Sequence, residues 1–205
     1  MIVIGLTGSI GMGKSTASAM LRRMGVPVHD ADASVHRLTG PGGAAVARIE
    51  EAFPGATKNG AVDRAALGPK VFGDKAALKR LESILHPMVA ADRNAFLKAC
   101  ALQGRPAAVL DVPLLFETGG DRLCDLTIAI TAPLFIQAQR VLARPGMTPE
   151  KLRDIRSRQM PETEKRRRAD VVIWSSLGRR PVLRALQNTL TMPVEPRNRW
   201  RSPHA

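Results

Sequence analysis

Gly8-Ser9-Ile10-Gly11-Met12-Gly13-Lys14-Ser15 directly follows a short apolar, β-branched run, Ile2 to Thr7, and leads into a helical pattern from Ser15 to Met24. The stretch fits G-x-x-x-x-G-K-[ST], in which successive backbone N–H groups surround phosphate oxygens at the N-terminus of a helix. The alternative is a tight glycine-rich turn with an incidental lysine. Because the motif, the preceding strand and the following helix agree, the sequence predicts a phosphate-binding loop, or P-loop.

The residue types of this loop account for its chemistry. Its glycines can adopt positive φ angles and let the backbone approach oxygen atoms closely. Lys14 supplies positive charge to the β- and γ-phosphates, and the hydroxyl of Ser15 is a ligand for Mg²⁺. We therefore expect ATP to be bound by Gly8, Gly11, Met12, Gly13, Lys14, Ser15 and Thr16, with Ser15 as the metal ligand.

Short apolar runs alternate with helical patterns along the rest of the chain. We expect strands at 26–29, 107–110, 126–130 and 171–173, and helices that include 135–143 and 182–190. Strands that alternate with helices form a parallel sheet with helices on both faces. The sequence therefore predicts an α/β fold with the three-layer core of a P-loop NTPase.

Two stretches and the tail depart from this alternation. Residues 44–103 are mostly helical, with a break at Pro54-Gly55 and a loop around Asn59-Gly60, which is too long for a simple crossover. We read it as an inserted helical substrate-binding domain, at about 33–105. The charged stretch at about 141–168, broken at Pro161, predicts a helical lid. Residues 193–205 carry proline and arginine and predict a disordered basic tail after a kinase domain at 1–192.

Charge indicates a polyanionic partner. The chain of 205 residues has 31 Lys and Arg against 18 Asp and Glu, a net charge of +13. Residues 150–205 hold 14 basic and 6 acidic residues, so +8 of that charge lies there. Such an excess attracts phosphates, nucleic acid or an acidic membrane surface. Aromatic residues make up 3% of the chain and Tyr is absent, which argues against base-stacking platforms and a nucleic-acid partner.

Cysteines and hydropathy bear on the compartment. Cys100 and Cys124 are the only cysteines and their spacing matches no metal pattern, so we expect a reducing cytoplasm. No segment approaches the ~18 uncharged apolar residues of a membrane span. We therefore expect small-molecule partners and no membrane, while the sequence leaves the oligomeric state open.

Two acidic positions follow predicted strands. Asp30 and Asp32 come after the second strand, at the edge of the sheet where open α/β folds bind ligands. One could accept the proton of an attacking hydroxyl, and helix capping by one of them is the alternative. Asp111 ends the third strand, where it is either an acid on the metal side of the site or a structural cap.

Basic residues are further candidates for the functional site. Arg140 and Arg144 lie four apart, which predicts one helix face at the edge of the lid. Their guanidinium groups could close on the transferring phosphoryl group, and a solvated basic face is the alternative. His86-Pro87 ends a helical run, so from the residues alone His86 is a cap or a packed side chain.

Absent motifs narrow the class of P-loop protein. No Asn-Lys-x-Asp and no Asp-x-x-Gly follows, so the guanine-reading and switch motifs of GTPases are missing. A small basic chain with a helical insertion and an arginine-rich lid is typical of a small-molecule kinase, which must exclude water from ATP. From the residues alone, another nucleoside or nucleotide kinase and an ATP-dependent nucleic-acid-binding module stay open as alternatives.

Several motifs together resemble those of the dephospho-coenzyme A kinase family, over about residues 2–190. In order they are Gly8 to Thr16, Asp30-Ala31-Asp32, Leu85-His86-Pro87, Asp111-Val112-Pro113-Leu114-Leu115-Phe116-Glu117, Arg140, Gln159 and Ala169-Asp170-Val171-Val172-Ile173. The P-loop is generic, but the other motifs in this order are specific together.

This resemblance implies ATP-dependent phosphorylation of the ribose 3′-hydroxyl of dephospho-coenzyme A, the last step of coenzyme A biosynthesis, with ATP and Mg²⁺. It implies a P-loop core, a helical substrate domain and a lid. Asp32 would act at the ribose hydroxyl, with Lys14 and Arg140 as the other catalytic residues and Arg140 acting from the lid. Asp32, His86, Arg93 and Asp111 would bind the substrate.

One position departs from the family. The family often carries Asn near the adenine of ATP, shortly after the Ala-Asp-x-Val-Ile run. This chain has Trp174-Ser175-Ser176 there. Ser175 can still form a hydrogen bond with the adenine, but its side chain reaches less far than that of Asn.

Overall fold

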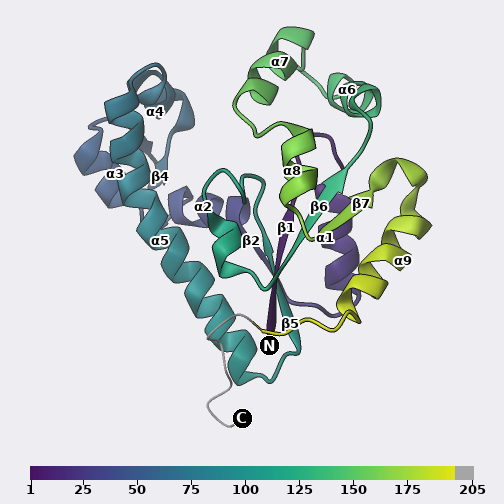
Figure 1. The fold of residues 1–205 in the computed structure, drawn as a ribbon. Coiled ribbons are helices and arrows are strands. Elements are labelled where there is room, and N and C mark those ends of the chain that lie inside the picture. The colour runs from purple at the N-terminus through teal and green to yellow at the C-terminus, as the bar shows by residue number, and fades with distance from the viewer. Residues whose placement is uncertain (197–205) are drawn as a thin grey trace. The chain divides into compact units, whose positions relative to one another are not determined.

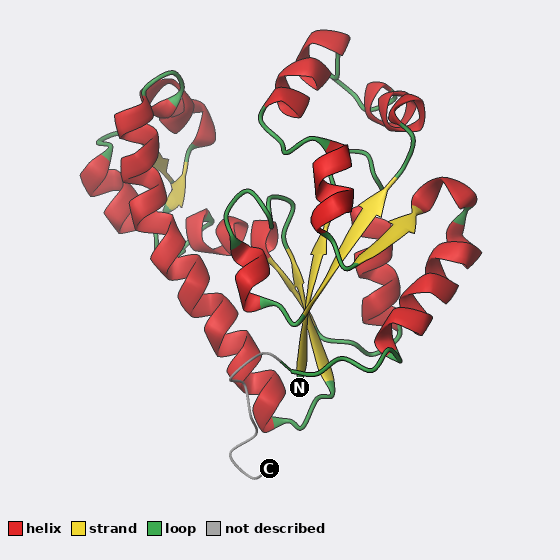
Figure 2. Cartoon of the chain, in the orientation of Figure 1, coloured by secondary structure: helices red, strands yellow, loops and turns green. Residues whose placement is uncertain are grey.

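The computed structural model describes residues 1–196, which fold into two compact units (Figures 1 and 2). The first unit comprises Met1–His29 and the chain from Cys100 to the end of the described residues. The second comprises Asp30–Ala99. No helix in the described part of the chain has the length and apolar character that crossing a bilayer requires.

The first unit contains a five-stranded parallel sheet in the order β2-β5-β1-β6-β7. Its strands are β1 (Ile2–Thr7), β2 (Val28–Asp30), β5 (Ala107–Asp111), β6 (Leu126–Thr131) and β7 (Val171–Trp174). β1 pairs in parallel with both β5 and β6, and β6 with β7. The predicted strands and the α/β P-loop fold are confirmed, with β2 beginning two residues later than expected.

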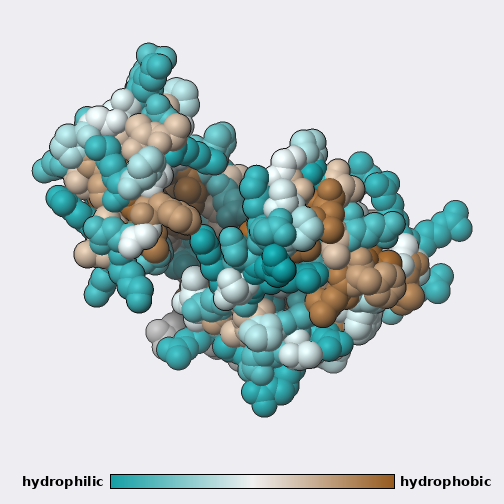
Figure 3. Space-filling model, turned by 90° about the horizontal axis from the view of Figure 1, so that it is seen from above, coloured by the Kyte–Doolittle hydropathy of each residue, from teal (hydrophilic) through white to brown (hydrophobic). Residues whose placement is uncertain are grey.

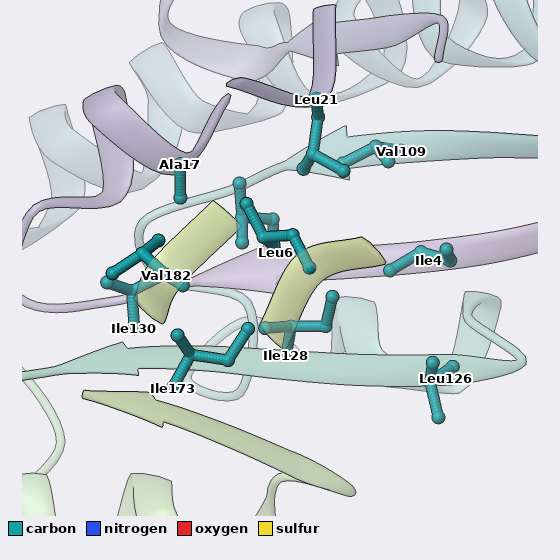
Figure 4. Packing of buried hydrophobic residues seen from close by; sticks show 11 residues of the cluster. Ile4, Leu6, Ala17, Leu21, Val109, Leu126, Ile128, Ile130, Ile173 and Val182 are labelled. Carbon is teal, nitrogen blue, oxygen red and sulfur yellow. The ribbon is translucent and has the colours of Figure 1, made fainter. Parts of the chain in front are cut away.

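Helices α1 (Lys14–Arg23) and α9 (Arg179–Leu190) lie side by side on one face of this sheet (Figure 1). Leu21 of α1 and Val182 of α9 are buried against Leu6 and Ile128 of the central strands (Figure 4). On the other face, a Cβ atom at Gly5 would lie 2.7 Å from Leu115 Cδ2, so the loop after β5 packs directly on β1. Burial on both faces explains why these strands are continuous apolar runs.

The remaining helices of the first unit lie between β6 and β7, and the predicted break at Pro161 separates the last two of them. They are α6 (Leu134–Leu142), α7 (Pro149–Ser157) and α8 (Glu162–Arg168), with short 3₁₀ turns η1 (Gly120–Leu123) and η2 (Ser175–Leu177). Pro161 precedes α8, as its rigid φ angle favours. Arg144 lies beyond the end of α6, so the prediction that Arg140 and Arg144 share a helix face is wrong. Pro145-Gly146 follows Arg144 and ends the helical pattern early.

The tail prediction falls mainly on residues 197–205, which lie outside the described residues. Of the four described residues of that segment, Val194 packs against the core of the first unit. The proposed lid at about 141–168 consists of the last residues of α6 together with α7 and α8.

The second unit is helical, as expected, with one short hairpin. Its helices are α2 (Ala31–Thr39), α3 (Val46–Ala52), α4 (Arg64–Val71) and α5 (Lys75–Leu102), of which α5 continues into the first unit. Strands β3 (Thr57–Lys58) and β4 (Ala61–Val62) pair antiparallel around Asn59-Gly60. These two residues have φ angles of 52° and 73°, so the expected loop is a hairpin turn that the Asn-Gly pair itself favours.

Helix α5 corrects the prediction that a helix ends at His86-Pro87. It runs for 28 residues with Pro87 inside it. A proline removes one backbone hydrogen bond from a helix. Apolar residues on both sides, Leu85 and Met88 among them, pack against the buried core of the second unit around Ile49. This packing holds the helix together across the proline.

Candidate active site

The glycines of the P-loop are sterically required. Gly11 and Gly13 have φ angles of 75° and 93°, which residues with side chains rarely adopt. A Cβ atom at Gly11 would lie 2.5 Å from Val141 Cγ2, and one at Gly8 would lie 2.7 Å from the carbonyl oxygen of Ile130. The loop backbone therefore passes closely against α6 and β6, and it leads into the N-terminus of α1, where backbone N–H groups favour an anion.

Lys14 is held beside the loop by Asp111. The Lys14 ammonium lies 2.6 Å from Asp111 Oδ1, and the two side chains are 15% and 3% exposed. Lys14 begins α1 and Asp111 ends β5, which pairs in parallel with β1, so the strand pairing brings both residues to one sheet edge. The sequence left two roles for Asp111, an acid on the metal side of the site or a structural cap. In the structure its carboxylate binds Lys14, and the residue caps no helix among the described elements.

Ser15 and Thr16 occupy the first turn of α1, and both are exposed. No group of three or more His, Cys, Asp or Glu residues among residues 1–196 is arranged to hold a metal ion. The exposed hydroxyl of Ser15 at the start of α1 fits Mg²⁺ that is held mainly by nucleotide phosphates and water, with one ligand from the protein. Ser15 is the residue of this loop that would supply the hydroxyl, and the ion would neutralise charge on the phosphates.

Arg140 and Ser175 form a hydrogen-bonded support beneath the loop. Arg140 donates from Nη1 to Ser175 Oγ at 2.8 Å and from Nη2 to the Ser175 carbonyl at 3.1 Å. Ser175 Oγ in turn donates to the carbonyl of Met12 at 2.7 Å. Met12 is itself fully buried, and its sulfur accepts a hydrogen bond from Ala132 N–H at 3.2 Å. The structure thus brings Arg140, Met12 and Ser175 together at the loop.

Both backbone groups of Ile10 are bound by glutamine side chains. Gln159 Oε1 accepts from Ile10 N–H at 3.3 Å, and Gln137 Nε2 donates to the Ile10 carbonyl at 2.8 Å. Gln137 Oε1 also accepts from Arg156 Nε of α7 at 2.9 Å. No motif of the sequence assigns a role to Gln137. The signal that could have indicated it is a polar residue at a buried position of a helix, since Gln137 is 1% exposed in α6.

A second contact joins the loop to the segment that precedes and begins α8. Ser9 donates from its hydroxyl to Glu162 Oε2 at 3.0 Å. Together with Gln159, this contact attaches residues 159–162 to the loop at two neighbouring positions. We call residues 159–162 the docking turn.

A cavity of about 600 Å³ lies beside the loop. Ser9 and Met12 of the loop line it together with Met160, Glu162 and Trp174, whereas Lys14 is not among its lining residues. It therefore adjoins the phosphate site on the side of the docking turn. Seen from above, apolar side chains interrupt the hydrophilic surface of the molecule (Figure 3), and exposed apolar residues of α6 include Leu134 and Phe135.

In the second unit, the two acidic candidates take different positions. Asp30 caps α2, because its Oδ1 accepts from Ala33 N–H at 3.0 Å. Asp32 is exposed in the first turn of the same helix. His86 and Arg93 lie seven residues apart on α5, and so on one face of that helix. Arg93 donates to Asn94 Oδ1 at 3.0 Å.

Comparison with known proteins places the chain in a family. The family model for dephospho-CoA kinase matches residues 2–178. A dephospho-CoA kinase of Rhodospirillum rubrum is 57% identical over 201 residues, which is 98% of this chain and 95% of that protein.

Solved structures agree with this result. The crystal structure of TT1252 from Thermus thermophilus is 37% identical, with a TM-score of 0.82 over 92% of this chain and 95% of that one. The dephospho-CoA kinase from Campylobacter jejuni is 23% identical, with a TM-score of 0.61 over 92% and 95% of the two chains, and shares the fold. The extent of the family match and of the similarity to the Rhodospirillum protein shows that this chain belongs to the dephospho-CoA kinase family.

Proposed function

We propose that the chain transfers the γ-phosphoryl group of ATP to the ribose 3′-hydroxyl of dephospho-coenzyme A, giving coenzyme A and ADP. The observation that carries this proposal is the family match over residues 2–178, which contain the P-loop and every candidate site residue. The geometry supports a phosphotransferase, because a sterically constrained glycine loop and a lysine at its end are suited to hold a triphosphate.

In this reaction the loop N–H groups and Lys14 bind the β- and γ-phosphates and stabilise the charge that develops on the transferred group. Asp32 accepts the proton of the 3′-hydroxyl as its oxygen attacks the γ-phosphorus. The bond between the γ-phosphorus and the β–γ bridging oxygen breaks, and ADP leaves. Arg140, which its hydrogen bonds to Ser175 hold at the loop, adds positive charge at the transferred phosphoryl group, and Ser175 binds at the adenine of ATP. His86, Arg93 and Asp111 bind the acceptor together with Asp32.

We further propose that the partners are small molecules, with no nucleic acid and no membrane, and that the enzyme works in the cytoplasm. The scarcity of aromatic residues supports this, since single-strand binders use aromatic stacking. A retardation assay with single- and double-stranded DNA and RNA at ~0.15 M salt tests it. Retardation at protein concentrations near those of the kinase assay would contradict the proposal.

An acceptor screen tests the activity. Purified protein is given ATP and Mg²⁺ with dephospho-coenzyme A, adenosine or AMP, and the products are identified by mass and by ³¹P NMR. We expect transfer to dephospho-coenzyme A alone, at the ribose 3′ position. Transfer to adenosine or AMP without transfer to dephospho-coenzyme A would instead establish another nucleoside or nucleotide kinase.

A further inference from the structure

A buried ion pair joins α8 to the loop that follows β5. Lys165 Nζ lies 2.9 Å from Glu117 Oε1, and the Lys165 side chain is 0% exposed while that of Glu117 is 18% exposed. Lys165 also donates to the Pro113 carbonyl at 3.3 Å, and the Thr7 hydroxyl donates to this same carbonyl at 3.0 Å. The pair therefore reaches the residue that ends β1, directly before the P-loop.

The same carboxylate holds the docking turn. Glu117 Oε1 accepts from the backbone N–H of Met160 at 2.8 Å. Met160 lies between Gln159, which binds Ile10, and Glu162, which binds Ser9. Glu117 thus fixes the middle of a four-residue segment whose two ends contact the P-loop.

A second contact strengthens the attachment of α8 to the same loop. The Arg168 guanidinium lies 4.8 Å from the centre of the Phe116 ring and binds Asp121 at 3.0 Å.

Burial raises the pKa of the Glu117 carboxyl, but its hydrogen bonds from Met160 N–H and Lys165 outweigh burial, so the pKa lies below its ordinary value. Glu117 is therefore ionised at neutral pH and attracts both donors.

We propose that Glu117 and Lys165 are positioning residues that seat the docking turn on the P-loop, so that Gln159 holds Ile10 in the conformation that binds ATP. This inference rests on the proposed function for its turnover measurements. The polar partners of Glu117 and Lys165 are Met160, Pro113 and each other, so the pair acts on the loop through Gln159. A displaced Gln159 leaves Ile10 N–H without its acceptor and lets the loop move relative to the phosphates, which lowers both ATP affinity and turnover.

The test is a mutant cycle. Glu117→Gln alone would leave the Lys165 charge buried and unpaired, so the main variant is Glu117→Gln with Lys165→Met, which removes both charges. The cycle is completed by Gln159→Ala and by the triple variant, which combines Glu117→Gln, Lys165→Met and Gln159→Ala. Glu164→Gln with Arg167→Gln is the matched control, because it removes one acid and one base from an exposed pair on the same helix.

We expect the pair variant and Gln159→Ala each to lower kcat about tenfold and to weaken ATP binding, with the KM for dephospho-coenzyme A unchanged. The triple variant should be no worse than the poorer of the two, because residues that act through one another are not additive. The control should match the wild type. Losses that multiply in the triple variant, or wild-type kcat and ATP affinity in the pair variant, would overturn the inference.

Two further measurements test the role of Glu117 and Lys165. Glu117→Asp retains the charge for Lys165 but withdraws the carboxylate from Met160, so it is expected to fold and to lose part of the same kcat; wild-type turnover in folded Glu117→Asp would contradict the role. ATP affinity, measured by calorimetry without an acceptor, reports on the pair whether or not dephospho-coenzyme A is the substrate. Failure of the proposed function would instead show as an inactive wild type with intact ATP binding.

Discussion

Lys14 supplies positive charge at the phosphate site, and its side chain is already held in position there. It is the loop residue whose ammonium can reach the β- and γ-phosphates, and in the structure it lies against Asp111. A lysine that is already held at the loop loses little side-chain freedom when the nucleotide binds.

Lys14→Ala is expected to lower kcat by about 10²-fold or more, because it removes a positive charge from the transition state of phosphoryl transfer. It also leaves Asp111 buried without this partner, which we expect to cost about 3 kcal/mol. Steady-state kinetics and thermal unfolding check both effects. Lys14→Ala with Asp111→Asn should recover stability but not turnover, and recovery of turnover would contradict the assignment.

Asp32 is the second residue whose role can be isolated. Since Asp30 already caps α2, Asp32→Asn is expected to fold normally. We expect kcat to fall about 10²-fold, because an amide cannot accept the proton of the 3′-hydroxyl. Calorimetry should show unchanged ATP affinity. Normal turnover with weakened ATP binding would assign Asp32 a structural role, and Asp30→Asn serves as the comparison for loss of a cap.

At the scale of elements, the P-loop depends on close packing against α6. Gly11 meets two constraints, a positive φ angle and a Cβ position 2.5 Å from Val141. Gly25, which follows the end of α1, has a φ angle of 78° but nothing within 4 Å of its Cβ position. The two glycines separate backbone strain from steric collision.

Gly11→Ala is expected to weaken ATP binding more than tenfold and to lower the melting temperature, because the loop must move away from α6. Gly25→Ala should cost only about 1 kcal/mol of stability and leave ATP binding intact. Calorimetry with ATP and thermal unfolding of both variants make the comparison. Equal ATP affinities in the two would show that the position of the loop against α6 is unimportant for binding.

The attachment of α8 to the loop after β5 predicts an acid dependence of stability. The folded-state pKa of Glu117 lies below its ordinary value of 4.5, so its contribution is complete above that value and disappears as the pH falls through the folded-state pKa. Thermal unfolding between about pH 6 and pH 3 should therefore show a shallower decline in the Glu117→Gln, Lys165→Met variant than in the wild type. Parallel declines would contradict the contribution of this carboxylate.

At the scale of the whole molecule, the net charge of +13 is opposite in sign to the charges of the two substrates, ATP and dephospho-coenzyme A. Long-range attraction raises the encounter rate and is screened by salt, with a Debye length of about 10 Å at 0.1 M. We expect kcat/KM to fall severalfold between ~0.02 and ~0.3 M KCl, while kcat at saturation changes less. Steady-state kinetics at constant Mg²⁺ test this, and a salt-independent kcat/KM would show that the excess charge has no role in substrate capture.

Local patterns of residue types in the sequence predicted most elements of the fold. The strands were predicted because each is a continuous apolar run, and the P-loop because its glycines, lysine and serine are consecutive. The Asn-Gly pair contained the signal for the hairpin between β3 and β4, but two-residue strands are too short for alternation to show. The helix that continues through Pro87 could not be predicted locally, since packing of the second unit sustains it.

By itself, therefore, the sequence determined the P-loop, the parallel sheet and, by resemblance, the family, because each depends on neighbouring residues or on motifs in a specific order. Only the tertiary structure decided which side chains support the loop. Gln159 is 149 residues from Ile10, and Met160 is 43 residues from Glu117. Hydrogen bonds over such separations depend on how strands and helices pack, and no local pattern of residue types specifies them.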